Sequence, residues 1–130
     1  MNLPNRIKLS KKATDRLRML RQRTGVTPNV LARVAIMQAL ETTTDLSNAG
    51  VNDADGQELN RDVLFGDLTS SFELLLQFYI EKNHIVEPLK DVIEALIEIG
   101  VHKIGHIKTV SDLAQFDTPQ LFEPKLLINQ

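Results

Sequence analysis

The sequence predicts a mainly α-helical single domain that starts with one short β-strand. Apolar residues recur three and four positions apart along most of the 130 residues, and only residues 6–10 show strict alternation. The length and the 42% apolar content fit one domain with a small core. We divide the chain into a basic strand–helix–helix part (6–41), a loop (42–62), an acidic helical part (63–113) and a tail (114–130).

The first expected element is a strand at Arg6–Ser10, whose alternation puts Ile7 and Leu9 on one face. A helix follows directly, because the apolar spacing changes to four and three after Ser10, a residue type that favours the N-cap position. We expect this helix to end at Gly25, since glycine accepts the left-handed conformation that C-caps commonly need.

A second helix is predicted at Pro28–Glu41, with Thr27 as its N-cap and proline at its first position. It is apolar nearly all round, which predicts burial on several sides, either at the centre of the fold or at a subunit interface. We therefore expect an oligomer. Arg33 is a polar exception inside this helix, and Glu58 and Glu41 are candidate ion-pair partners for it.

Residues 42–62 are rich in Thr, Asn, Asp and Gly without a sustained period, which predicts a long surface loop. A third helix follows, and then a fourth at Pro88–Ile99 with Glu94 and Glu98 on its outer side. A short fifth helix is expected from Ser111. The apolar side of the third helix consists of Phe65, Leu68, Phe72, Leu75, Leu76 and Tyr79.

The charges are distributed unevenly along the chain. Residues 1–40 contain nine basic side chains and one acidic side chain, a net charge of +8, whereas the remaining ninety residues contain six basic and sixteen acidic side chains, a net charge of −10. Such asymmetry predicts an anionic partner for the basic end. The candidate DNA-binding residues are Arg6, Lys8, Lys11, Lys12, Arg16, Arg18, Arg21 and Arg23.

Several function classes find no support in the sequence. The chain contains no cysteine, so it cannot ligate an iron–sulfur cluster through thiolates, and it has no phosphate-cradling Gly-Lys loop. A calcium loop at residues 51–62 lacks the first carboxylate, and the three histidines are interpreted as surface residues. We expect no enzyme activity, cofactor or metal. No signal sequence and no apolar run of about 18 residues is visible, so a soluble cytoplasmic protein is expected.

The order of strand, helix, Gly-Val-Thr-Pro turn and helix in residues 5–41 resembles a ribbon-helix-helix module. The resemblance implies that strands from two subunits pair and enter a DNA groove, with Arg6, Lys8 and Ser10 facing the bases. It also implies that Thr27 and Asn29, at the start of the second helix, bind a phosphate.

Four blocks make a more specific resemblance: TGVTPNVLARVAIMQALE, DGQELNRDVLFGD, FELLLQFY and GVHKIGHIKTVSDL resemble successive parts of the DndE family of DNA sulfur modification proteins. This resemblance implies a small helical subunit, a homotetramer, that binds double-stranded DNA with a preference for nicked duplex. Its partners would be a cysteine desulfurase, an iron–sulfur protein and an ATPase of a restriction-modification type system. The basic residues would hold the DNA backbone without reading its sequence.

Two other functions remain open at this point. A ribbon-helix-helix transcriptional regulator or antitoxin would bind one specific operator as a dimer. A scaffold would use its basic face to dock an acidic protein surface. The acidic helices serve solubility or contact basic partner subunits.

Overall fold

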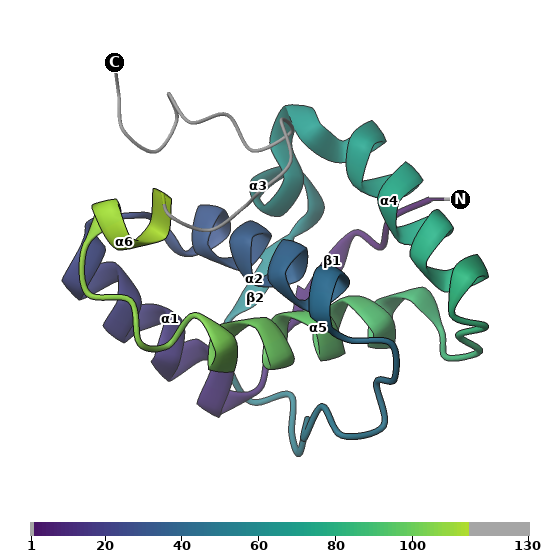
Figure 1. The fold of residues 1–130 in the computed structure, drawn as a ribbon, viewed down its shortest axis with the longest axis horizontal. Coiled ribbons are helices and arrows are strands. Elements are labelled where there is room, and N and C mark those ends of the chain that lie inside the picture. The colour runs from purple at the N-terminus through teal and green to yellow at the C-terminus, as the bar shows by residue number, and fades with distance from the viewer. Residues whose placement is uncertain (1, 115–130) are drawn as a thin grey trace.

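The computed structural model describes residues 2–114, which form the mainly helical domain that the sequence predicts (Figure 1). In chain order the elements are β1 (Arg6–Lys8), α1 (Lys11–Thr24), α2 (Pro28–Thr42), β2 (Glu58–Asn60), α3 (Arg61–Phe65), a 3-10 turn (Gly66–Leu68), α4 (Thr69–Lys82), α5 (Leu89–Lys103) and α6 (Val110–Ala114). The rest of the predicted tail lies outside the described residues. The predicted N-terminal strand is present, and Ile7 and Leu9 are buried as the alternation requires.

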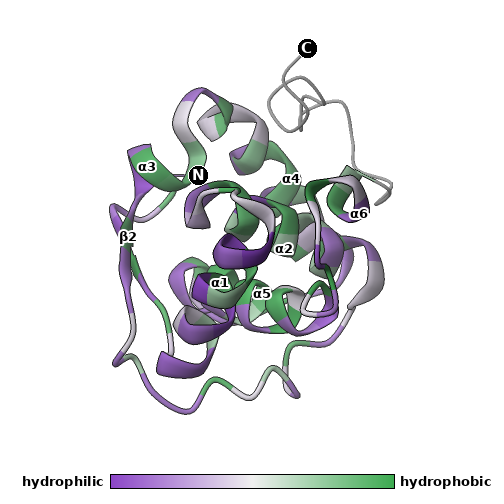
Figure 2. Ribbon diagram, turned by 90° about the vertical axis from the view of Figure 1, so that its left-hand side faces the viewer, coloured by the Kyte–Doolittle hydropathy of each residue, from purple (hydrophilic) through white to green (hydrophobic). Residues whose placement is uncertain are grey.

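Helix α2 lies at the centre of the fold and packs most extensively against α5 (Figure 1). Hydrophobic residues predominate where α2 and α5 pack together, whereas much of α1 is hydrophilic (Figure 2). Leu31, Ala35 and Ile36 of α2 are fully buried, as are Ile93 and Leu96 of α5. The chain itself therefore covers most of the apolar surface of α2, so this helix does not require a partner subunit.

Helix α5 is longer than the sequence predicts. It passes through Gly100 and ends at Lys103, whereas the glycine suggested an end near Ile99. Gly100 is buried where α5 crosses α2, and a Cβ at this position would overlap the backbone carbonyl of Ala35. The glycine therefore allows close helix packing here rather than ending the helix.

The prediction of a continuous loop over residues 42–62 is wrong at its C-terminal end. Residues Glu58–Asn60 form β2, which pairs antiparallel with β1, with Ile7 opposite Leu59. Both of these residues are buried, so the small sheet covers one side of the core. The ribbon-helix-helix resemblance implied that β1 pairs with a strand of a second subunit; the partner that the structure shows for β1 is β2 of the same chain.

Asn60 and Arg61 follow β2 and fix the N-terminal segment. The Asn60 side chain accepts hydrogen bonds from the amides of Asp62 and Val63, so it is the N-cap of α3. Arg61 donates from Nη1 to the carbonyl of Leu3 at 3.3 Å. These two residues therefore have a structural function.

The predicted third helix is divided in two. The 3-10 turn separates α3 from α4, and Phe65 and Phe72 pack across it with ring centroids 4.9 Å apart.

The segment Arg61–Lys82 has 22 residues, and an 18-residue window within it reaches a mean hydropathy of 1.2. By length and composition this is enough to cross a bilayer, and 28% of the window is buried. From the sequence we expected no segment apolar and long enough to cross a bilayer. By length and composition this segment is one, so that expectation is wrong.

Arg33 does not pair with Glu58 or Glu41 within the described residues. Its Nη1 donates to the carbonyl of Phe65 at 3.4 Å, and its Nε is buried without a partner among residues 2–114. Burial lowers the pKa of the guanidinium. Glu58 instead pairs with Arg6 at 3.8 Å on the exposed face of the sheet.

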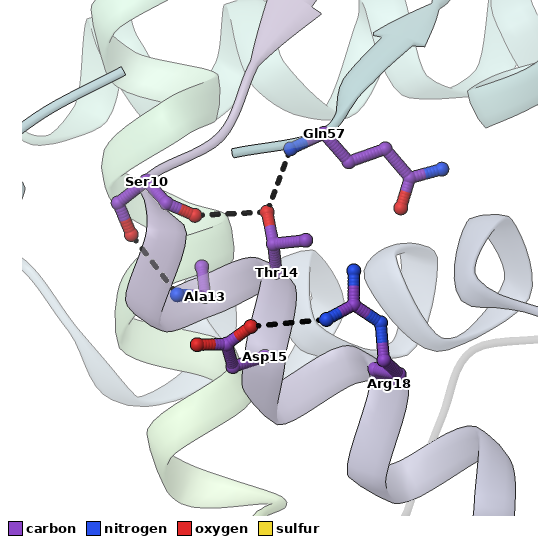
Figure 3. Close-up of polar contacts among 6 residues, drawn as sticks. All are labelled: Ser10, Ala13, Thr14, Asp15, Arg18 and Gln57. Carbon is purple, nitrogen blue, oxygen red and sulfur yellow. Dashed lines mark hydrogen bonds and ion pairs between the residues drawn. The ribbon is translucent and has the colours of Figure 1, made fainter. Parts of the chain in front are cut away.

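The start of α1 is tied to two distant segments. Ser10 is the N-cap and accepts from the Ala13 amide at 3.0 Å, while the Thr14 hydroxyl donates to the Ser10 carbonyl and accepts from the Gln57 amide (Figure 3). Ser10 Oγ also donates to Glu98 Oε1 at 2.6 Å. Two sequence expectations are corrected here: Ser10 is buried and cannot face DNA bases, and Glu98 is buried rather than on the outer side of α5.

Replacing Ser10 with Ala is expected to lower the free energy of unfolding by about 2 kcal/mol, because the helix loses its cap and a buried carboxylate loses its donor. Urea unfolding followed by circular dichroism measures this change. Ser70→Ala, at an exposed position in the first turn of α4, is the matched control. Equal midpoints for the two variants would contradict the role given to Ser10.

The calcium-loop residues also have a structural function. The Asp53 carboxylate accepts hydrogen bonds from the amides of Lys11 at 2.9 Å and Asp55 at 3.0 Å. The bonds from Asp55 and Lys11 hold the pKa of this carboxyl below its ordinary value. Asp53 thus fastens the loop to the start of α1. Within residues 2–114, no three His, Asp or Glu side chains gather closely enough to hold a metal ion.

Candidate nucleic-acid interface

The eight predicted DNA-binding residues all lie on β1 and α1, and seven of them are exposed while Arg16 is half-buried. The predicted DNA-binding residues of α1 lie on two different sides of the helix, because of their spacing. Lys12, Arg16 and Arg23 lie on the side that faces the C-terminal end of α5, whereas Arg18 and Arg21 lie on the other side. The predicted residues therefore do not form a single stripe.

Two arginines connect α1 to the end of α5. Arg16 Nη1 lies 3.0 Å from Nδ1 of His102, and Arg23 Nη1 donates to the carbonyl of Gly105 at 3.2 Å. A guanidinium can only donate, so Nδ1 of His102 accepts and its ring proton lies on Nε2. His102 and the adjacent Lys103 are thereby brought beside the basic residues of α1.

A pocket of about 330 Å³ lies between α1, α5 and residues 48–50 of the loop. Four basic side chains line it, Lys12 and Arg16 from α1 and His102 and Lys103 from α5. We call these four residues, together with Arg23, the α1/α5 basic face. Glu98 forms part of the pocket wall, where its carboxylate is held by Ser10.

Most of the predicted cations have no acidic partner. Among the eight, Arg6 lies 3.8 Å from Glu58 and Arg18 lies 3.2 Å from Asp15, and both pairs are exposed, where an ion pair stabilises little. In the described part of the chain, the side-chain nitrogens of the other six have no carboxylate oxygen within 4.0 Å. They are Lys8, Lys11, Lys12, Arg16, Arg21 and Arg23.

The remaining sequence expectations fall outside this pocket. Thr27 is the N-cap of α2 by its backbone conformation, but its side chain makes no capping hydrogen bond. The phosphate site expected at the start of α2 therefore stays a prediction.

His84 follows α4 with a positive φ of 54° and does not line the pocket that contains His102.

His102 and Lys103 are pocket residues that the sequence reasoning did not select. They lie about ninety residues after Lys12, in a part of the chain whose net charge is negative. Helical spacing extended through Gly100 would have placed them at the end of α5, but their position beside α1 depends on tertiary packing.

The fold and the pocket define a small helical protein with one two-stranded sheet and a cluster of basic side chains between two helices. The chain belongs to the DndE family: the family model described as DNA sulphur modification protein DndE matches residues 6–112. It is therefore a member of a family of DNA phosphorothioation proteins, with a role within that modification system. No curated protein matches the chain.

Two solved structures agree with this assignment. The crystal structure of DndE from Escherichia coli B7A, described as involved in DNA phosphorothioation modification, is 29% identical, with a TM-score of 0.67 over 80% of this chain and 99% of that chain. A glycine-to-lysine mutant of DndE, described as involved in DNA phosphorothioation, is 26% identical, with a TM-score of 0.63 over 78% of this chain and 98% of that chain.

Proposed function

We propose that this protein is a non-catalytic, DNA-binding subunit of phosphorothioate modification that holds the backbone of duplex DNA. The observation that supports this most directly is that the side chains of six predicted cations form no ion pair within residues 2–114. Lys and Arg side chains that are not neutralised within the protein attract phosphates and release counterions from DNA. Binding of this kind positions the duplex without reading its sequence.

The proposal includes a preference for nicked duplex. A nick lets the backbone bend, so phosphates on its two sides can reach cations on different elements. Arg6 and Lys8 on β1, the exposed arginines of α1 and Lys103 on α5 lie on separate elements. A flexible duplex can contact more of these residues than an intact one.

Binding to intact, nicked and single-stranded DNA of two unrelated sequences, measured across a salt series, tests this function. We expect similar affinity for the two sequences, the tightest binding to the nicked duplex, and an affinity that falls steeply with salt. Tight binding to one sequence only would favour the regulator or antitoxin. No binding to any DNA at low salt would leave the basic face as a protein-docking surface.

The proposal also includes a homo-oligomer, a tetramer, in the cytoplasm. Leu74 and Phe78 on the outer face of α4 support self-association, since 70% and 64% of their surfaces are exposed. Four copies of a weak basic face would bind DNA by avidity. The chain has no cysteine, so in this proposal the desulfurase, the iron–sulfur protein and the ATPase perform the chemistry.

A further inference from the structure

We propose that the pocket between α1 and α5 binds a phosphate monoester, that is, a phosphate group with one unesterified end. The monoester is either the end of a DNA strand or a free phosphate ester. The first of these rests on the proposed function, and the second does not. The pocket is built by two helices and a loop that lie far apart in the sequence, and its volume of about 330 Å³ is at the lower end for small-molecule sites.

The donors in this pocket match the charge of such a group. Lys12, Arg16 and Lys103 supply three positive charges from two helices, and no ion pair within the described residues involves any of them. A phosphate monoester carries a charge of about −1.5 to −2 at neutral pH and three acceptor oxygens, whereas a backbone diester carries one charge. Three cations therefore favour the monoester.

Arg16 is held in place to donate to a ligand. Its Nη1 is bonded to Nδ1 of His102, so the orientation of the guanidinium is set before a ligand enters. Four of its five N–H donors are not used in that bond, and guanidinium groups commonly bind phosphates through two parallel hydrogen bonds. The ring of His102 then presents its Nε2 proton as another donor.

The carboxylate of Glu98 repels an anionic ligand, and its position determines which part of the ligand it can contact. Its Oε1 accepts from Ser10, and the residue is only 6% exposed, so the carboxylate forms the wall of the pocket. The hydrogen bond from Ser10 uses one carboxylate oxygen only, so the other is the one that can accept from a ligand. A sugar hydroxyl next to the phosphate fits this position, because a hydroxyl can donate to the carboxylate while the phosphate oxygens accept from the cations.

The shape of the site favours a terminal group over a phosphate within a duplex. A phosphodiester in a duplex is flanked by two sugars and lies on a convex surface, but these four side chains surround a concavity. A group at the end of a chain, or on a free nucleotide, can enter such a concavity without distortion. The shared chemistry is the monoester, and experiment must separate its two sources.

NMR titration of the full chain with inorganic phosphate tests the site directly. We expect the amide signals of Gly50 and His102 to shift, while those of Phe72 in the core stay unchanged. Lys103→Gln should weaken this binding about fivefold or more, because it removes one charge from the pocket. Lys108→Gln removes the same charge outside the pocket and should match the unmodified protein.

The source of the monoester is tested with duplexes that differ only in having 5′-phosphate or 5′-hydroxyl ends. Tighter binding of the phosphorylated ends, lost in Lys103→Gln and kept in Lys108→Gln, assigns the pocket to DNA termini. Equal binding of the two duplexes, together with phosphate-induced shifts, assigns it to a free phosphate ester. Unmoved pocket amides, or the same titration for both variants, would overturn the inference while the proposed DNA binding could still hold.

Discussion

Replacing Gly100 with Ala is expected to lower the free energy of unfolding by at least about 3 kcal/mol, although alanine is the better helix former. Gly100 is buried where α5 crosses α2, and an added Cβ would overlap the carbonyl group and Cα of Ala35. These atoms are backbone, so no side-chain rotation can relieve the overlap. The two helices must move apart along the most extensive contact in the fold.

Urea unfolding followed by circular dichroism measures this effect, since the chain has no tryptophan for fluorescence. Asp91→Ala, at an exposed position near the start of the same helix, is the control and should cost less than about 1 kcal/mol. Adding Ala35→Gly to Gly100→Ala should not restore stability, because the overlap is with backbone atoms. A Gly100→Ala variant within 1 kcal/mol of the unmodified protein would show that the two helices have room to separate.

Local signals in the sequence predicted the elements whose ends depend on neighbouring residues. Ser10 caps α1 and Gly25 ends it with a φ of 75°, as their residue types indicated. Pro28 begins α2, and the apolar character of that helix predicted a position either at the centre of the fold, where it lies, or at a subunit interface. In each case the determining groups lie within a few residues of the boundary, so the sequence pattern was sufficient.

The features that the sequence did not predict depend on distant contacts. Strand β2 has three residues, too few for a recognisable alternation, and its hydrogen-bonding partner lies about fifty residues earlier in the chain. Gly100 indicates a helix end by residue type, yet its function is close packing against Ala35. Glu98 looks like an exposed acid in the helical pattern, but the start of α1 covers it.

The candidate site was likewise predicted in part from the sequence, and the rest of it depends on distant contacts. The concentration of positive charge in residues 1–40 identified α1, because charge counts need no structure. It could not show that Lys12 and Arg16 line a pocket or that His102 and Lys103 complete it, because these positions follow from the packing of α5 against α1. Residues 1–40 therefore supply only two of the four basic side chains of the pocket.

Charge reversal on the α5 side of α1 is expected to cause the largest loss of DNA binding. Lys12→Glu/Arg23→Glu should weaken duplex binding at least about 100-fold at low salt and make the dependence of log K on log salt shallower by about two units, because two phosphate contacts are lost. These two residues belong to the α1/α5 basic face, where Lys103 adds a further cation. The measurement is a salt series with one duplex of fixed sequence.

Two further double variants separate local contacts from net charge. Arg18→Glu/Arg21→Glu reverses the other side of α1, and Lys82→Glu/Lys90→Glu reverses exposed residues on α4 and at the start of α5. Each pair changes two charges by two units, so all three variants go from a formal net charge of −2 to −6. At physiological salt the Lys82/Lys90 variant should stay within about threefold of the unmodified protein, since neither residue belongs to the α1/α5 basic face and salt screens exposed charges.

The order of the three affinities then locates the DNA. If the α5-side variant loses most, the duplex lies against both helices, and the residues supplied by α5 belong to the interface. A larger loss for Arg18→Glu/Arg21→Glu would place DNA on the side of α1 away from α5 and leave the pocket free for a separate ligand. Equal losses in all three would mean that overall charge alone governs binding, and the α1/α5 basic face would then have no special function.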